Sequence, residues 1–192
     1  MSHTAVLFAG GYSRRMGRDK AGLDWHGRPL GEHQAATLVA SGAWPLLLSC
    51  RHDQTWAPAG FARIEDRADQ GGALQAFVDA FAATTAPVVT TLAVDLPLLT
   101  SDLLEKFTGT ARETGVSVVP VHDSLFEPFA AAWHRSALSE LQAASAAGRS
   151  LQSVCAALQA AGRLQPHALT AEEAKQLANL NTPDDLARVD NP

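Results

Sequence analysis

The sequence predicts a single α/β domain in which helices cover both faces of a mostly parallel sheet. Short, fully apolar runs alternate with longer amphipathic stretches, and strands that are apolar throughout are typical of parallel sheets buried on both faces. The 192 residues correspond to one domain by the usual measure of about 150 residues per domain. No internal repeat or low-complexity linker divides the chain, so we expect one domain over residues 1–192.

Six short apolar runs are expected to form the strands. The clearest is Pro87–Val94 (PVVTTLAV), and the first, Thr4–Gly10, ends in glycine. The others are Ala43–Cys50, Phe61–Asp66, Gly115–Val121 and Pro128–Trp133. In sheets of this kind ligands bind beyond the carboxyl ends of the strands, so the residues that follow each strand are candidates for a site.

Amphipathic spacing predicts the helices. In Leu74–Ala83, apolar residues recur at the i, i+3, i+4 and i+7 positions of one helix face. A helix over Ser101–Thr114 can be capped by Thr100 or Ser101, with Asp102 in its first turn. The remaining expected helices are Leu30–Ser41, two alanine-rich segments at Ser136–Ala147 and Leu151–Ala161, and a short last helix that begins at Asn181–Pro183 with Thr182 as its cap.

Composition limits the function classes. The chain has 15 Lys and Arg against 20 Asp and Glu, a net charge of −5, which argues against a nucleic-acid or anionic-membrane partner. The two cysteines, Cys50 and Cys155, lie far apart and outside any metal-ligand spacing, as in proteins of a reducing compartment. No run approaches the roughly 20 apolar residues of a membrane span. We therefore expect a soluble, cytoplasmic protein.

The segment after the first strand concentrates glycine and positive charge. Between positions 14 and 20 there are four cations and one anion. Gly10 and Gly11 can present backbone amides to an anion, and Arg15 and Lys20 can neutralise phosphate oxygens. The spacing fits neither the P-loop nor the dinucleotide fingerprint. The loop thus predicts a phosphate site of another kind, with a solvated basic loop as the alternative.

The run FAGGYSRRMGRDKAGL resembles the signature loop of the nucleotidyltransferase family, in its molybdenum cofactor guanylyltransferase branch. The resemblance extends over essentially the whole chain. Its other landmarks are Ile-Glu-Asp at 64–66, Asp-Leu-Pro at 95–97, Phe-Glu-Pro-Phe at 126–129 and Asn-Leu-Asn-Thr-Pro-Asp-Asp-Leu at 179–186. It implies a three-layer Rossmann-like nucleotidyltransferase fold, with an N-terminal part that binds the nucleotide and a C-terminal part that binds the acceptor.

The resemblance also implies the site residues. The residue that matches Asp95 binds Mg²⁺ in the family, and the strand-end carboxylate alone already suits a cation that is shared with substrate phosphates. With Arg15 and Lys20 it makes the expected catalytic set. The expected nucleotide-binding residues are Phe8, Ala9, Gly10, Gly11, Lys20, Asp66 and Asp95. Asn181 is a weaker candidate, because an asparagine there can also serve only the turn.

The implied reaction transfers GMP from GTP to molybdenum-loaded molybdopterin, with Mg²⁺, and releases pyrophosphate. The terminal phosphate of the acceptor is already a nucleophile, so catalysis would consist of positioning and charge neutralisation. The product would pass to molybdenum cofactor insertion proteins or apo-oxidoreductases. Arg14, Arg18 or Arg51 could supply the charge that the acceptor phosphate needs.

Two departures from the family leave alternatives open. Residues 71–76 read Gly-Gly-Ala-Leu-Gln-Ala, where the family usually has Gly-Pro-Leu-Ala-Gly, and the second strand ends in Cys50-Arg51 where asparagine is frequent. CTP, another nucleotide or a sugar-phosphate acceptor therefore remain possible, as does a non-catalytic nucleotide-binding module. A hydrolase is poorly supported because no GxSxG elbow accompanies the histidines. Trp44, Trp56 and Trp133 are expected to pack in the core.

Overall fold

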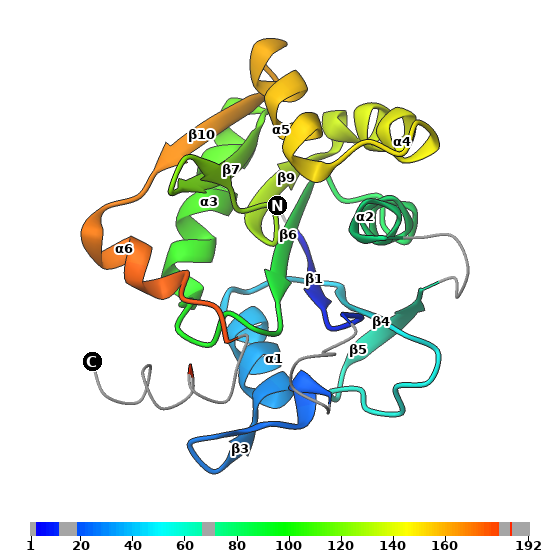
Figure 1. The fold of residues 1–192 in the computed structure, drawn as a ribbon, viewed down its shortest axis with the longest axis vertical. Coiled ribbons are helices and arrows are strands. Elements are labelled where there is room, and N and C mark those ends of the chain that lie inside the picture. The colour runs from blue at the N-terminus through cyan, green and yellow to red at the C-terminus, as the bar shows by residue number, and fades with distance from the viewer. Residues whose placement is uncertain (1–2, 12–18, 67–71, 181–184, 186–192) are drawn as a thin grey trace.

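A central sheet separates two helical layers in the computed structural model, which describes residues 3–11, 19–66, 72–180 and 185 (Figure 1). Within these residues the strand order is β10-β7-β9-β6-β1-β4-β5, and β8 pairs with β7. The strands are β1 Thr4–Phe8, β4 Leu46–Cys50, β5 Phe61–Glu65, β6 Val88–Ala93, β7 Ser117–His122, β8 Leu125–Phe126, β9 Ala130–His134 and β10 Leu164–Ala168. Only β8 and β9 run antiparallel to their neighbours in this sheet. The expected mostly parallel α/β sheet is thus confirmed.

Each face of the sheet is covered by its own set of helices. Along β1, Ala5 and Leu7 belong to one buried cluster while Val6 and Phe8 belong to the other, because successive strand residues point to opposite faces. The first cluster packs against α1 Leu30–Ala40 and α3 Ser101–Thr114. The second packs against α2 Ala73–Ala82, α4 Leu138–Ala146 and α5 Leu151–Ala160. No described helix has the length and apolar character needed to cross a bilayer.

Several short elements were not expected from the sequence. They are the hairpin β2 Asp24–Trp25 and β3 Arg28–Pro29, strands β8 and β10, helix α6 Ala171–Gln176, and the 3-10 turns η1 Lys20–Gly22 and η2 Arg135–Ala137. The edge strand β10 buries only Leu164 and contains Pro166, so it lacks the apolar run of a buried strand and suits only an edge. Helix α6 buries no residue and is held by a Thr170–Glu173 capping box. The expected helix start at residues 181–183 lies outside the described part.

Of the three tryptophans expected to pack in the core, Trp44, Trp56 and Trp133, one does not. Trp133 is fully buried, as expected, and Trp56 packs against the first cluster as a partly buried side chain. Trp44 is 65% exposed, so that prediction is wrong. Its backbone amide donates to the His3 carbonyl at 2.7 Å, which places Trp44 beside the amino end of β1. Pro45 follows it and lacks an amide, and the strand accordingly begins one residue later, at Leu46.

Four parallel strands end together and form the edge that carries the candidate site residues. Phe8 of β1 pairs with Ser49 of β4 and with Ala93 of β6, and Ser49 pairs with Ile64 of β5. The segments that follow these strands therefore meet at one edge of the sheet, as expected for a ligand site in this class of fold.

Candidate active site

An ion pair joins two of the expected catalytic residues, which lie 75 positions apart in the sequence. The Nζ atom of Lys20 lies 2.8 Å from Oδ2 of Asp95. The two side chains are only 14% and 24% exposed. Lys20 is placed by η1, whose cap Asp19 accepts a hydrogen bond from the Ala21 amide at 3.0 Å. A lysine and a carboxylate held this way can each contact a phosphate or its counter-ion.

The backbone around Asp95 is held from two sides. The buried Gln34 of α1 donates through Nε2 to the carbonyls of Ala93 at 3.1 Å and Leu96 at 2.6 Å. The amide of Leu180 donates to the Asp95 carbonyl at 2.9 Å. Sequence reasoning missed Gln34, although a polar residue on the apolar face of a predicted helix is a signal that could have singled it out. These contacts fix the turn that carries the Asp95 carboxylate.

Asp66 follows β5 and lies against the glycine loop. Its Oδ1 accepts a hydrogen bond from Ser49 Oγ at 3.2 Å. A Cβ atom on Gly10 would lie 2.1 Å from the Asp66 Oδ2 atom, so the close approach of this carboxylate requires glycine at position 10. Burial raises the pKa of the Asp66 carboxyl, while the Ser49 hydrogen bond and the charge of Arg51 act in the opposite direction.

The raised pKa of Asp66 predicts that removal of its charge stabilises the folded protein. A carboxyl whose pKa is raised on folding makes the folded state less stable while it is ionised. We expect Asp66→Asn to raise Tm at pH 7, because the amide carries no charge that folding must desolvate. The gain in unfolding free energy should be complete above the raised folded-state pKa and vanish as pH falls below the ordinary value of 3.8. Thermal melts across pH check this; a lower Tm for the variant at pH 7 would contradict it.

Two side chains that follow β4 donate hydrogen bonds to the backbone carbonyls of the glycine loop. Arg51 Nη1 donates to the carbonyls of Gly10 and Gly11, at 3.4 and 3.0 Å. Gln54 Nε2 donates to the Ala9 carbonyl at 3.0 Å. Gln54 was not singled out from the sequence, and Arg51 was considered only as a partner of the acceptor phosphate. In the structure Arg51 contacts the loop itself.

The remaining expected site residues either face the core or lie outside the described residues. The Phe8 ring is buried and stacks on Phe77 at a centroid distance of 4.8 Å, so the ring faces the core. The backbone carbonyl of Phe8 accepts a hydrogen bond from the Val94 amide. Arg15 and Asn181 lie outside the described residues, as do Arg14 and Arg18. Within the described residues no group of three or more His, Cys, Asp or Glu side chains could hold a metal ion. Mg²⁺ is usually bound by one or two carboxylates together with substrate phosphates, so Asp95 alone is compatible with it.

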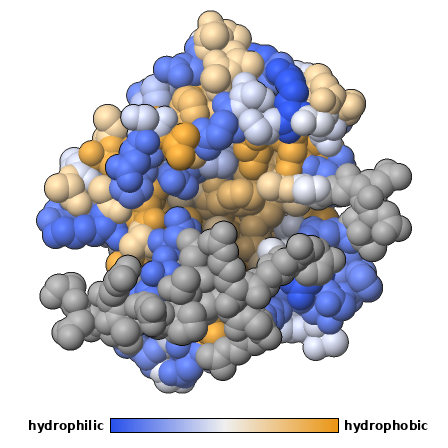
Figure 2. Space-filling view, in the orientation of Figure 1, coloured by the Kyte–Doolittle hydropathy of each residue, from blue (hydrophilic) through white to orange (hydrophobic). Residues whose placement is uncertain are grey.

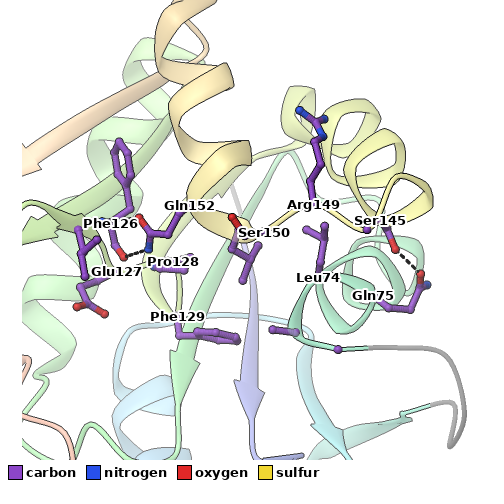
Figure 3. A pocket seen from close by; sticks show the side chains of 15 residues that line it. Leu74, Gln75, Phe126, Glu127, Pro128, Phe129, Ser145, Arg149, Ser150 and Gln152 are labelled. Atoms are coloured by element: carbon purple, nitrogen blue, oxygen red, sulfur yellow. Dashed lines mark hydrogen bonds between the residues drawn. The ribbon is translucent and has the colours of Figure 1, made fainter.

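A pocket of about 630 Å³ opens between the start of α2, the β8–β9 turn and the α4–α5 loop (Figure 3). Leu74 and Phe129 lie along its apolar wall, and Arg149 points away from its centre. Gln152 exchanges two hydrogen bonds with the Phe126 backbone, at 3.1 and 2.7 Å. Figure 2 shows a hollow with a hydrophobic floor near the centre of this face. The volume of the pocket lies within the range of small-molecule sites.

Glu127 lines the pocket and carries a shifted carboxyl pKa. Burial raises the pKa of the Glu127 carboxyl, His122 lowers it, and the charges of Asp95 and Asp123 raise it further. The backbone gives the geometric link: the Ala93 amide, two residues before Asp95, donates to the carbonyl of the pocket residue Phe129 at 2.9 Å.

Comparisons with known proteins show the family to which the chain belongs. The family model described as "MobA-like NTP transferase domain" matches residues 5–181. The chain is 36% identical to the molybdenum cofactor guanylyltransferase of Xanthomonas euvesicatoria pv. vesicatoria, over 98% of this chain and 96% of that protein. It is 33% identical to the molybdenum cofactor guanylyltransferase of Pseudomonas putida, over 94% of each.

Solved structures show the same fold. Molybdopterin-guanine dinucleotide biosynthesis protein A from Archaeoglobus fulgidus superposes with a TM-score of 0.77 at 22% identity, over 97% of this chain and 96% of that one. The 2-C-methyl-D-erythritol 4-phosphate cytidylyltransferase from Thermus thermophilus superposes with a TM-score of 0.75 at 18% identity, over 98% and 97%. At these identities the likeness concerns the fold alone.

Proposed function

The chain belongs to the family of MobA-like NTP transferase domains, and from that premise we propose that it transfers GMP from GTP to molybdenum-loaded molybdopterin. The product is the guanine dinucleotide form of the cofactor, and pyrophosphate is released. The two relatives named molybdenum cofactor guanylyltransferase, similar over nearly the full length, support this substrate pair. The enzyme class follows from the family: the protein is a nucleotidyltransferase.

The observation that carries the proposal is the Lys20–Asp95 pair at the strand edge where the glycine loop also lies. The acceptor phosphate attacks the α-phosphorus of GTP, a new P–O bond forms, and the bond to pyrophosphate breaks. Lys20 neutralises charge on the triphosphate and the leaving group, and the amides of Gly10 and Gly11 bind the nucleotide. Arg15 is proposed to assist Lys20, and Asn181 to lie beside the phosphates. Asp66 is proposed to contact the guanine nucleotide.

A divalent cation belongs to this proposal, because nucleotidyltransferases of this family generally use one. We propose Mg²⁺, held by the Asp95 carboxylate together with substrate phosphates. When bound, it would supply positive charge to the phosphate oxygens.

The acceptor is proposed to bind in the C-terminal part of one nucleotidyltransferase domain that covers residues 1–192. Support comes from the pocket bounded by Phe126–Phe129 and Gly148–Gln152, which is large enough for an organic ring system and apolar on its inner wall. Its wall residue Phe129 accepts a hydrogen bond from the amide of Ala93, two residues before Asp95, at 2.9 Å, which supports an acceptor bound near the nucleotide. The opposite wall of the pocket, Gly72–Gln75 at the start of α2, belongs to the N-terminal part that is proposed to bind the nucleotide.

We also propose a cytoplasmic enzyme that passes its product to molybdenum cofactor insertion proteins or apo-oxidoreductases. The thiols Cys50 and Cys155 are both free and buried. Free thiols are expected in a reducing compartment.

The second candidate function is a transferase that uses CTP in place of GTP, and base specificity distinguishes the two. The N-cap of α2 is Gly72 and its first residue is Ala73, where the family usually has Gly-Pro, and the cytidylyltransferase neighbour has the same fold. Pyrophosphate release should be measured with Mg²⁺, molybdenum-loaded molybdopterin and each of GTP, CTP, ATP and UTP. We expect GTP to be used at least about 100-fold better than CTP, because hydrogen-bonding groups discriminate strongly between bases.

Other outcomes of this assay separate the alternatives. A preference for CTP would make the protein a cytidylyltransferase with the same phosphate site. Binding of GTP without release of pyrophosphate would indicate a different acceptor, such as a sugar phosphate, or a non-catalytic module. A reaction without acceptor serves as the control for simple GTP hydrolysis.

A further inference from the structure

Three consecutive carbonyls of the glycine loop are held on one side by two side chains. Gln54 Nε2 donates to the carbonyl of Ala9, and Arg51 Nη1 donates to the carbonyls of Gly10 and Gly11. Arg51 and Gln54 both lie in the segment after β4, and we call them the loop clamp. Gln54 is 4% exposed and the Arg51 side chain is 14% exposed, so both donors act from within the protein.

The clamp determines the direction of the loop amides. In a planar trans peptide the N–H points opposite to the C=O of the same unit. Because the carbonyls of Ala9 and Gly10 face the clamp, the amides of Gly10 and Gly11 face away from it. No residue in the described ranges accepts a hydrogen bond from either amide. Two consecutive oriented amides form a concave site for an anion or an oxygen atom.

The clamp is itself fixed in place. Arg51 Nε donates to Asp53 Oδ1 at 2.9 Å, and the Arg51 amide donates to Gln54 Oε1 at 2.8 Å. Gln54 Nε2 also donates to Asp19 Oδ2 at 2.6 Å. Since Asp19 caps the turn that begins with Lys20, one glutamine connects the start of the loop with the residue before the lysine.

We propose that Arg51 is a positioning residue for nucleotide binding, which holds the Gly10 and Gly11 amides in the orientation that the nucleotide needs. This proposal rests on the proposed function, because it takes the bound molecule to be GTP. Groups that are oriented before binding lose less conformational freedom when the ligand arrives. Removal of the guanidinium should therefore weaken GTP binding more than it slows the transfer step.

The experiment compares Arg51→Ala and Arg51→Lys with Arg63→Ala. Arg63 is a matched control on β5: its Nη1 donates to the Trp56 carbonyl at 3.2 Å and its Nη2 lies 3.3 Å from Glu65 Oε1. The Kd of Mg²⁺–GTP is measured by calorimetry without acceptor, beside KM, kcat and Tm. We expect Arg51→Ala to raise Kd and KM for GTP about 10-fold, as for the loss of a charged hydrogen-bond donor, with kcat changed less than about threefold.

Further readouts separate positioning from a general loss of structure. Arg51→Lys should recover part of the affinity, because an ammonium group can reach one carbonyl but lacks the planar guanidinium. Arg63→Ala should leave Kd unchanged. An unchanged Kd in Arg51→Ala, an equal loss of affinity in Arg63→Ala, or a wild-type protein that binds no GTP would each overturn the proposal. Wild type that binds GTP but transfers nothing to molybdopterin would refute the proposed function alone, since the Kd values would still report on the clamp.

Discussion

Asp95→Asn is expected to lower kcat/KM for pyrophosphate release about 10³-fold, with the fold intact. Asparagine keeps the shape of the side chain and leaves the backbone bond from Leu180 to the Asp95 carbonyl in place. It removes the negative charge that faces the Lys20 ammonium group at 2.8 Å and that would hold the divalent cation. Losses of this size are typical when one preorganised electrostatic group is removed from an active site. Steady-state kinetics and thermal melts of the purified variant measure both effects.

Glu173→Gln provides the matched control for this variant. It removes another carboxylate that pairs with a lysine, Lys106, at 2.7 Å, but on α6 rather than at the glycine loop. We expect Glu173→Gln to keep wild-type kcat/KM. The role assigned to Asp95 would be wrong if Asp95→Asn kept activity within a few-fold of wild type, or if both variants lost activity to the same extent.

Gly10→Ala is expected to have the largest effect on nucleotide binding among substitutions of the loop. The added Cβ would lie 2.1 Å from Asp66 Oδ2, so the loop, the carboxylate or both must move. Overpacking of this kind costs about 1–3 kcal/mol of stability, and we expect the Kd for GTP to rise at least about 10-fold. Gly109→Ala in α3 is the control, because its Cβ would meet no atom within 4 Å and alanine favours a helix interior.

A double-mutant cycle tests the cause of the Gly10→Ala effect. Asp66→Ala removes the carboxylate that the new Cβ would meet, so the double variant should recover Tm toward the Asp66→Ala value. Contacting residues show such non-additivity, whereas independent sites add. Additive losses of Tm would show that the strain arises elsewhere in the loop, and wild-type Tm and Kd in Gly10→Ala would contradict the close approach altogether.

The sequence alone predicts most of the fold, because the signals involved are local. The helix expected over Ser101–Thr114 has the same bounds in the structure, with Thr100 as its cap. Strands β1, β5 and β6 lie within the runs that predicted them. The runs of β1 and β6 lack polar alternation because two buried clusters cover both faces of the sheet there. The exposed edge strand β10 and helix α6 were missed, because neither carries a buried periodic face.

Candidate site residues also follow from the sequence, since Lys20, Asp66 and Asp95 each stand in a recognisable motif after a strand or in the glycine loop. How these residues are brought together was decided by the tertiary structure alone. The ion pair between Lys20 and Asp95 spans 75 positions, and Gln34 reaches the Asp95 turn from 59 and 62 positions away. Arg51 and Gln54 act on carbonyls about 40 positions earlier in the chain. Such side-chain bonds to distant backbone have no periodic signature, because they depend on where the folded chain places its carbonyl groups.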